Sequence, residues 1–307
     1  MTPDPLPVLF FEAALADEYL DLIAGRATAV GPDRSELAGA DGVIAAGGRW
    51  DAATLAGAPR VRVVSRSGVG YDSVDVPSLR AAGIEACYAP DAPTVSTAEH
   101  AVALMMAITK DLPAVQARSN AGLGGFAAPR SLELAASTLG LVGFGRIARR
   151  VAVAGAALGM RVIAYDPYLA ADAAVDGVAL VPLATLLAES DVVSLHAPAT
   201  EASYHLIGAT TLATMKPGAY LVNCARGGLV DQDALLAALD NGHLAGAGLD
   251  VTEPEPLPAG HPLLDHPKVI VTPHIASSTR AGRRRLFEHA IDNALAVLDG
   301  RPATLIP

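Results

Sequence analysis

Short apolar runs alternate with amphipathic or Ala/Leu-rich segments from residue 138 onward, and turn residues separate them. This rhythm is typical of strands and helices that alternate in a parallel sheet. The apolar runs with the length of buried strands are 138–142, 161–165, 191–195, 219–223, 245–249 and 268–272. We therefore expect a doubly wound α/β domain whose parallel sheet has six strands.

A looser version of the same rhythm fills the first third of the chain. Its strand candidates are residues 7–11, 42–46, 61–65 and 84–88. At 307 residues the chain is also too long for one compact core. We therefore expect a second, smaller α/β unit.

Helix signals lie between the strand candidates. Asp231 is a good N-cap for the apolar segment 234–239, and Asn241-Gly242 supplies a stop that tolerates left-handed backbone. Residues 96–99, Ser-Thr-Ala-Glu, fit a capping box, and residues 101–109 after them are apolar on nearly every face. A helix of this kind should be buried, between domains or subunits. Residues 120–129, rich in Gly and Ala, predict a loop.

Composition limits the classes of function. Apolar residues make up 51% of the chain and charged residues 18%, and no apolar run approaches the roughly 18 residues of a membrane span. The N-terminal sequence lacks the basic start of an export signal, so we expect a cytoplasmic protein. The net charge of -10 argues against nucleic acid or an anionic membrane as partner.

Two local features could point to other partners. Arg283, Arg284 and Arg285 form a basic cluster, but beside Leu286 and Phe287 they fit the solvated face of a helix better than a nucleic-acid patch. The two cysteines, Cys87 and Cys224, are far apart and lack metal-ligand spacing, so we expect reduced thiols and no metal.

A glycine pattern, G-x-G-x-x-A, directly follows the strand candidate 138–142 and opens a helical segment. Gly143 permits a tight turn, Gly145 lets the backbone approach a pyrophosphate, and Ala148 lets helix and strand pack closely. Asp166 ends the next strand, where a carboxylate can bind a ribose 2′-hydroxyl and repel a 2′-phosphate. The pattern predicts a Rossmann-type domain that binds NAD rather than NADP.

Polar residues gather where the six strand candidates end, which is the ligand-binding edge of a parallel sheet. Arg226 could hold a substrate carboxylate with a bidentate guanidinium, or form a structural ion pair. His274 could exchange a proton with a substrate hydroxyl, or be a core histidine. The Pro-rich segment 253–258 follows Asp250, and either Glu253 or Glu255 could pair with His274 unless the segment is only an acidic surface loop.

In the smaller unit, residues 66–72 follow the strand candidate 61–65. Closely spaced glycines there could aim backbone amides at an anion, or simply form a turn. Arg66 could recognise a phosphate, or bond to the backbone of its own loop, and Arg130 is a weaker candidate for the same role.

These motifs together resemble the D-isomer specific 2-hydroxyacid dehydrogenases, the family of D-3-phosphoglycerate, D-lactate, glycerate and hydroxypyruvate/glyoxylate enzymes, over nearly the whole chain. The matching segments are 67–72 (SGVGYD), 141–147 (LVGFGRI), 215–218 (MKPG), 223–231 (NCARGGLVD), 248–251 (GLDV), 255–256 (EP) and 272–276 (TPHIA).

The resemblance implies an NAD-dependent interconversion of a small D-2-hydroxy acid and its 2-keto acid. It implies that Arg226 binds the substrate carboxylate and carbonyl, that His274 is the acid/base, and that Glu255 pairs with it. The implied substrate loop comprises Arg66, Ser67, Gly68, Val69 and Gly70. The implied cofactor residues are Gly143, Gly145, Arg146, Ile147, Asp166, Ala197, Pro198, Cys224, Ala225 and Asp250.

The resemblance also implies a domain plan and a homodimer joined through the nucleotide-binding domains. Residues 1–98 and 282–307 would form a flavodoxin-like substrate domain from both termini, and residues 99–281 the NAD-binding domain. Ala148 stands where many members have a third glycine, and a tryptophan common in the loop near Gly124-Gly125-Phe126 is absent, which leaves substrate size open. We expect no regulatory domain after Pro307.

Two other functions fit the same motifs. The chain could be an NAD-sensing scaffold or corepressor, but Arg226, Glu255 and His274 occur together, which favours catalysis. It could oxidise formate or phosphite on the same fold, but a glutamate rather than a glutamine precedes Pro256. The identity of the 2-hydroxy acid stays open.

Overall fold

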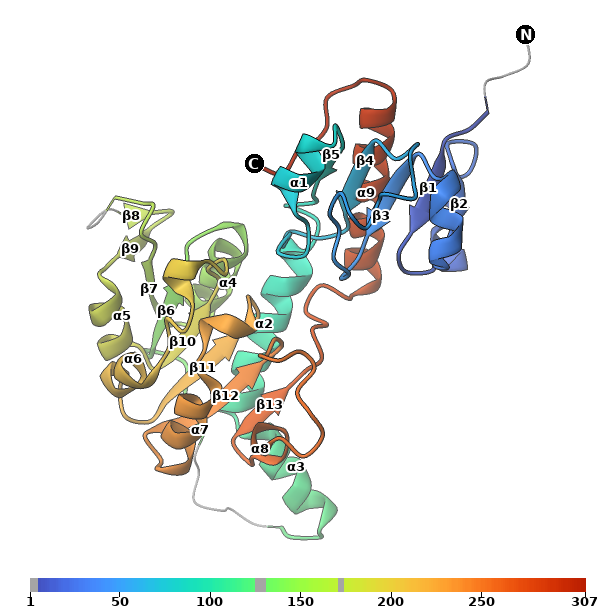
Figure 1. The fold of residues 1–307 in the computed structure, drawn as a ribbon. Helices are drawn as coiled ribbons and strands as arrows, with labels where there is room; N and C mark the ends of the chain where they lie inside the picture. The colour runs from blue at the N-terminus through green and yellow to red at the C-terminus, as the bar shows by residue number, and fades with distance from the viewer. Residues whose placement is uncertain (1–4, 125–130, 171–173) are drawn as a thin grey trace. The chain divides into compact units, whose positions relative to one another are not determined.

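The structure, a computed structural model, describes residues 5–124, 131–170 and 174–307. Within it the chain forms two compact units (Figure 1). The smaller unit comprises Met1–Thr94 and Ser278–Pro307, and the larger unit comprises Val95–Ser277. Arg130, the weaker candidate for a phosphate ligand, lies outside the described residues, and so do residues 125–129 of the predicted loop.

The larger unit contains a doubly wound sheet, as predicted. Its strands in the order of the sheet are β13 (Val269–Val271), β12 (Leu244–Leu249), β11 (Ala219–Asn223), β10 (Val192–Leu195), β6 (Thr138–Val142), β7 (Arg161–Tyr165), β9 (Val178–Leu180) and β8 (Ala174–Val175). Neighbours are parallel except β8 and β9. The expected number of six strands is wrong, because the described part of the sheet has eight. The two extra strands, β8 and β9, are too short to leave a hydrophobic period in the sequence.

Helices pack on both faces of this sheet. The helices of the larger unit are α2 (Thr94–Thr109), α3 (Leu112–Asn120), α4 (Arg146–Ala157), α5 (Leu183–Glu189), α6 (Ala209–Thr214), α7 (Gln232–Asp240) and α8 (Pro262–Asp265), and α3 has no buried residue. Buried residues of α2 and α4 share one apolar cluster with Leu139 and Leu141, whereas those of α5, α6 and α7 share another with Leu221. Successive strand residues therefore pack on opposite faces, as a sheet covered on both sides requires.

The predicted caps have different outcomes. Asp231 caps α7 by accepting a hydrogen bond from Ala234 N at 3.0 Å, and the helix stops at Asn241 before Gly242, whose φ is +79°. Both predictions are confirmed. The predicted capping box is wrong, because α2 already begins at Thr94, and Ser96 and Thr97 are buried within it.

The smaller unit has a flavodoxin-like sheet. Its order is β2 (Thr28–Val30), β1 (Val8–Phe11), β3 (Gly42–Ala45), β4 (Val63–Arg66) and β5 (Glu85–Cys87), and all neighbours are parallel. The other elements are α1 (Val76–Ala81), the 3-10 helices Asp17–Leu22 and Arg34–Gly39, and α9 (Arg280–Leu298). Strand β2 was not predicted, because its sequence Thr-Ala-Val is not part of an apolar run of strand length.

The C-terminal segment completes the smaller unit, as the resemblance implied. Phe287, Ile291 and Ala294 of α9 are buried in a cluster with Phe11 and Ile44. The basic cluster lies on the same helix, and two of its side chains, Arg284 and Arg285, bind within the unit. Arg284 pairs with Asp21, and Arg285 Nε donates to Ala92 O at 3.1 Å.

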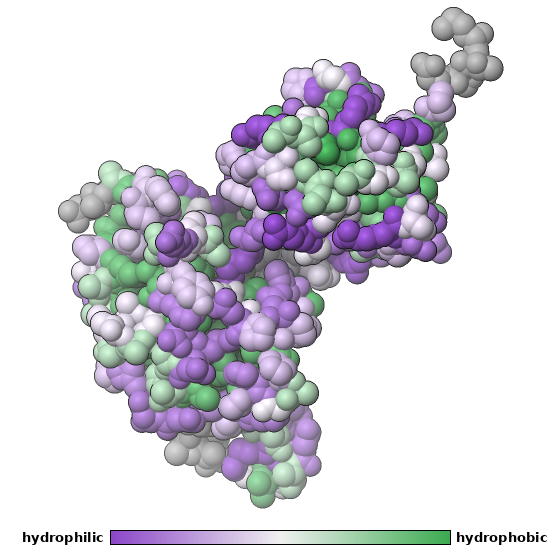
Figure 2. All heavy atoms as spheres, viewed as in Figure 1, coloured by the Kyte–Doolittle hydropathy of each residue, from purple (hydrophilic) through white to green (hydrophobic). Residues whose placement is uncertain are grey.

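The surface of the described residues carries mixed polarity. Hydrophilic side chains lie between apolar ones on the visible face of both units (Figure 2). Every helix in the described part of the chain is too short or too polar to cross a membrane.

Candidate active site

The sheet order of the larger unit reverses between β6 and β10, which is where doubly wound sheets bind ligands. The loop after β6 contains Gly143, with φ of +84°. A Cβ on Gly143 would lie 2.8 Å from Ala197 N, in the loop after β10. Only glycine therefore lets the two loops meet, and the structure brings these two predicted cofactor residues together.

Helix α4 starts directly after this turn, with Gly145 as its N-cap and Arg146 and Ile147 in its first turn. A glycine cap has no side-chain acceptor, so the first-turn amides can serve a phosphate. Asp166 adjoins the turn, since its Oδ2 accepts from Phe144 N at 2.9 Å and its Oδ1 accepts from Tyr168 N at 2.9 Å. This glycine cradle, with a carboxylate at the end of β7, fits the diphosphate and ribose of a dinucleotide.

His196 directly follows β10, at the carboxyl edge of the sheet. Burial lowers its pKa to about 4, and its Nε2 lies 2.9 Å from Ser194 Oγ. The following residues Ala197 and Pro198 are half-buried and exposed, respectively. Pro198 O accepts a hydrogen bond from Ser203 Oγ at 2.7 Å, which orders the loop.

Arg226 lies in a tight turn after β11. Asn223 holds this turn, because its Nδ2 donates to Arg226 O at 2.8 Å and its Oδ1 accepts from Ala225 N at 3.0 Å. A Cβ on Gly227 would lie 2.0 Å from Thr252 O, so glycine is required for the turn to approach the segment after β12. Cys224 is buried beside this turn, and burial raises the pKa of its thiol.

His274 lies in a turn after β13, with φ of +51°, a conformation that is rare for residues other than glycine. Its amide donates to Asp250 O at 2.8 Å. Its Nδ1 contacts Glu255 Oε1, and both side chains are partly exposed, at 47% and 37%. Glu253 instead lies 3.4 Å from His205 Nε2. Glu255 therefore orients the imidazole and leaves Nε2 as the nitrogen that can meet a substrate.

Asp250 directly follows β12. Its carboxylate is fully buried and accepts from Thr272 Oγ1 at 2.6 Å, Ile275 N at 2.9 Å and Ala276 N at 2.8 Å. These donors flank His274 on both sides. The carboxylate therefore holds the turn that carries His274, and its predicted role in lining the cofactor stays a prediction.

His100 on α2 was not singled out from the sequence. Its Nε2 lies 3.0 Å from Thr272 Oγ1 and 3.3 Å from Asp250 Oδ1, so it contacts the network that holds the His274 turn. The available signal was a titratable side chain within an apolar helix, but its partners Asp250 and Thr272 lie 150 and 172 residues further along the sequence. Among the described residues, no cluster of His, Cys, Asp and Glu could hold a metal ion.

The predicted substrate loop belongs to the smaller unit and follows β4. Ser67 N and Ser67 Oγ both donate to Ala45 O at 2.9 Å, and Gly68 O accepts from Ala89 N at 2.9 Å. Arg66 Nη1 donates to Ser67 O at 3.0 Å, so this side chain bonds to the backbone of its own loop. A Cβ on Gly68 would lie 2.9 Å from Arg66 Nη1, and glycine makes room for that bond.

Comparison with known proteins shows what the chain is similar to. Residues 102–276 match the family model of the D-isomer specific 2-hydroxyacid dehydrogenase, NAD binding domain. The chain is 40% identical over 276 residues to D-3-phosphoglycerate dehydrogenase of Mycobacterium tuberculosis, covering 88% of this chain but only 52% of that relative. It is 41% identical over 262 residues to glyoxylate reductase of Korarchaeum cryptofilum, covering 83% and 79% of the two chains.

A solved structure agrees over nearly the full length. The crystal structure of D-lactate dehydrogenase from Aquifex aeolicus, complexed with NAD and lactic acid, has a TM-score of 0.83 and 30% identity, and the match covers 95% of this chain and 96% of that one. The chain spans about half the length of the phosphoglycerate dehydrogenases it matches. On the family model and these identities, the chain belongs to the D-isomer specific 2-hydroxyacid dehydrogenases.

Proposed function

We propose that this protein is an NAD-dependent oxidoreductase that interconverts a small D-2-hydroxy acid and its 2-keto acid. The observation that carries the proposal is the contact between His274 Nδ1 and Glu255, at the same sheet edge as Arg226 and the Gly143 turn. An imidazole oriented by a carboxylate is suited to acid/base work on a hydroxyl. The names of the relatives support the same class of reaction.

In this mechanism Arg226 binds the substrate carboxylate and polarises the C2 carbonyl, because a guanidinium offers two parallel donors. When bound, NAD would supply or accept the hydride at C2. His274 Nε2 donates a proton to the oxygen at C2 during reduction and accepts it during oxidation. Glu255 holds the imidazole in place and stabilises its protonated form.

Steady-state kinetics of the wild type and of two variants from pH 5 to 10 test the proposal. Reduction should be fast where His274 is protonated and oxidation where it is neutral, so the two directions should have opposite pH dependences. His274→Ala should lower kcat in both directions by about 10² to 10⁴-fold. Arg226→Lys should weaken keto-acid binding and slow turnover, because a point charge cannot replace a bidentate fork. Near-full activity of His274→Ala would overturn the mechanism.

Glu255 and Glu253 form a matched pair for the same experiment. Glu255→Gln removes the carboxylate that orients the imidazole of His274, so kcat should fall in both directions with little change in KM for NADH. Glu253→Gln removes the same charge two residues away and should leave kcat close to the wild-type value. Equal losses of kcat in the two variants would contradict this role of Glu255.

Cofactor choice is a separate part of the proposal. A 2′-phosphate would meet the Asp166 carboxylate, so NADH should be used far more efficiently than NADPH. Asp166→Ser should narrow this preference, chiefly through KM for NADPH. Equal efficiency of the wild type with both cofactors would contradict the assignment of Asp166.

A further inference from the structure

The loop that follows β3 in the smaller unit is held by one carboxylate from the neighbouring strand β1. Glu12 directly follows β1. Its Oε2 accepts from Ala46 N at 2.5 Å and from Trp50 Nε1 at 3.0 Å, and its Oε1 accepts from Gly48 N at 2.7 Å. A Cβ on Gly48 would lie 2.0 Å from Glu12 Oε1, so the loop closes tightly around the carboxylate. Glu12 therefore fixes the path of the chain from Ala46 to Trp50.

The indole of Trp50 is buried, with an aromatic ring and a cation packed against it. Phe10 packs on it edge-on, with the ring centroids 6.1 Å apart, and the guanidinium carbon of Arg34 lies 4.9 Å from its ring centroid. Arg34 Nη2 would lie 3.7 Å from a Cβ on Gly48, the same position that lies 2.0 Å from Glu12 Oε1. The cation and the carboxylate are therefore close neighbours, and their opposite charges attract each other.

Both ends of the predicted substrate loop, which follows β4, are attached to the segment that Glu12 holds. At the start of the loop, Ser67 N and Ser67 Oγ donate to Ala45 O at 2.9 Å. Beyond its end, Trp50 N donates to Ser73 O and Asp75 N donates to Trp50 O, both at 2.8 Å. The substrate loop is therefore anchored at Ala45 and at Trp50.

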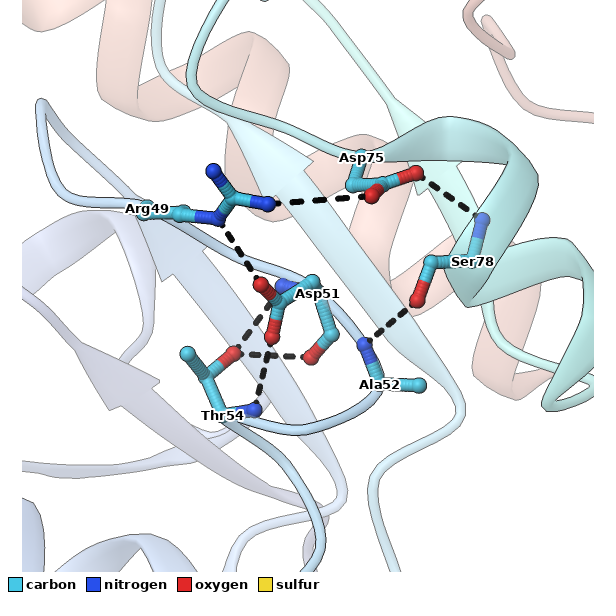
Figure 3. A network of polar contacts seen from close by, with 6 residues as sticks. All are labelled: Arg49, Asp51, Ala52, Thr54, Asp75 and Ser78. Carbon is cyan, nitrogen blue, oxygen red and sulfur yellow. Dashed lines mark hydrogen bonds and ion pairs between the residues drawn. The ribbon is translucent and has the colours of Figure 1, made fainter.

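An ion pair forms a second bridge between the same two segments (Figure 3). Arg49 Nε lies 2.9 Å from Asp51 Oδ2, and Arg49 Nη2 lies 3.9 Å from Asp75 Oδ2. The side chain of Arg49 is 74% exposed, and exposed ion pairs contribute little stability. The buried Trp50 is therefore the stronger link between the two segments.

The substrate loop offers backbone donors that could bind an anion. The described residues provide no acceptor for the amides of Gly68, Val69 and Gly70. Free amides in a glycine-rich turn can bind a carboxylate, and their directions depend on where the ends of the turn are held. A shift of either anchor would therefore move these donors away from the oxygen atoms of a ligand.

We propose that Glu12 and Trp50 are positioning residues for substrate binding. Through their hydrogen bond they hold the two anchors of the substrate loop in place, and so set how tightly the loop amides bind the carboxylate of a 2-keto acid. The inference rests on the proposed function and on the predicted role of the substrate loop. Every contact that carries it lies within the smaller unit.

Steady-state kinetics with NADH and either glyoxylate or hydroxypyruvate test this role. Trp50→Phe removes the N–H donor and keeps an aromatic ring, whereas Glu12→Gln removes the charged acceptor. Each variant should raise KM for the keto acid by about tenfold, the order that the loss of one hydrogen bond corresponds to. Both kcat and KM for NADH should stay within about twofold, because the loop amides bind the carboxylate alike in the ground state and in the transition state.

Two further variants sharpen the comparison. Glu85→Gln is the matched control and should resemble the wild type, because Glu85 is exposed at the start of β5, away from these strand ends. In the double variant, Trp50→Phe should raise KM less in the Glu12→Gln background than in the wild type, since the two residues share one bond. Fully multiplicative effects would overturn the inference, and so would an unchanged KM in both single variants.

Urea unfolding shows which variants are folded in the assay, and if Trp50→Phe does not fold, Glu12→Gln alone decides. If the wild type reduces neither keto acid, the proposed function fails, and hydrogen exchange still tests the inference. The amides of Ser67 and Asp75 bond to the two anchors, so they should exchange at least about tenfold faster in the folded variants than in the wild type or in Glu85→Gln. Equal exchange rates would overturn the role of Glu12 and Trp50.

Discussion

At the scale of single residues, two adjacent glycines in the Arg226 turn differ in what surrounds them. A Cβ on Gly227 would lie 2.0 Å from the backbone oxygen of Thr252, whereas a Cβ on Gly228 would meet only side chains, the Tyr204 ring at 3.4 Å and Glu253 Oε1 at 3.6 Å. Backbone atoms cannot move aside as a side chain can. Position 227 therefore requires glycine, whereas position 228 should tolerate a small side chain.

Gly227→Ala should lower the free energy of unfolding by about 1 to 3 kcal/mol, the usual cost of overpacking. It should also lower activity, because the Arg226 turn must shift away from Thr252. Gly228→Ala should have a clearly smaller effect on both quantities. Urea unfolding and kcat/KM of the two variants measure the difference, and equal effects would contradict the steric explanation.

His196 links this edge of the sheet to acid stability. Burial lowers its pKa to about 4, so the folded protein leaves it neutral where the unfolded chain, with an ordinary value near 6.5, already binds a proton. Protonation therefore favours the unfolded state as the pH falls below about 6.5. The loss grows until the pH reaches the folded-state value.

The wild type should lose up to about 1.4 kcal/mol of unfolding free energy per pH unit from this residue between pH 6.5 and 4. His196→Gln should flatten that part of the profile, whereas His289→Gln, at an exposed position, should not. Urea titrations from pH 4.5 to 7.5 provide the comparison. A profile as steep in the His196 variant as in the wild type would refute the assignment.

At the scale of elements, α2 contributes more than apolar cover. His100 reaches Asp250 and Thr272 from this helix, and these two residues hold the turn after β13 that carries His274. The side chain of His100 is 20% exposed and that of Asp250 fully buried, so the contact is shielded from water. Helix α2 therefore stabilises the turn that carries His274 through the contacts of His100.

His100→Leu should remove the hydrogen bond to Thr272 Oγ1 and the contact with the Asp250 carboxylate, at a cost of about 1 to 3 kcal/mol. We expect a lower kcat with a smaller change in KM for NADH, since His100 acts through the His274 turn. His100→Gln, which keeps an N–H donor, should recover part of kcat, and Glu99→Gln, at an exposed neighbour, should resemble the wild type. No recovery in His100→Gln would argue that the ring is needed only for packing.

At the scale of the whole molecule, the apolar surface available for a homodimer lies on α3 and not on residues 101–109, where we expected it. Leu104, Met105 and Ile108 of α2 are buried in the core of the larger unit. The following helix α3 has no buried residue, and it exposes two large apolar side chains, Leu112 at 52% and Val115 at 50%. The proposal of a homodimer therefore rests on α3 rather than on residues 101–109.

Light scattering at micromolar concentration should give twice the mass of the chain. Leu112→Glu combined with Val115→Glu should shift the protein toward monomer, because charges do not tolerate burial at an apolar interface. Val153→Glu is the control, since Val153 is 72% exposed on another helix, α4. A wild-type monomer, or a dimer unaffected by the α3 changes, would exclude this interface.

The sequence by itself determined the features that depend on local pattern. The bounds of β6, β7 and β11 match the predicted runs at residues 138–142, 161–165 and 219–223. The cap at Asp231 and the stop at Asn241-Gly242 are equally local, because capping involves residues three or four positions apart. These signals are complete within a short window of the chain.

Only the tertiary structure decided which residues meet across the fold. The carboxylate that contacts His274 is Glu255 rather than Glu253, and a Pro-rich loop has no period that could distinguish them. The contacts of His100 likewise depend on Asp250 and Thr272, which directly follow two neighbouring strands and lie side by side although they are far apart from His100 in sequence. Sequence patterns place a residue at the end of a strand, but hydrogen-bond partners follow from the order of the strands in the sheet.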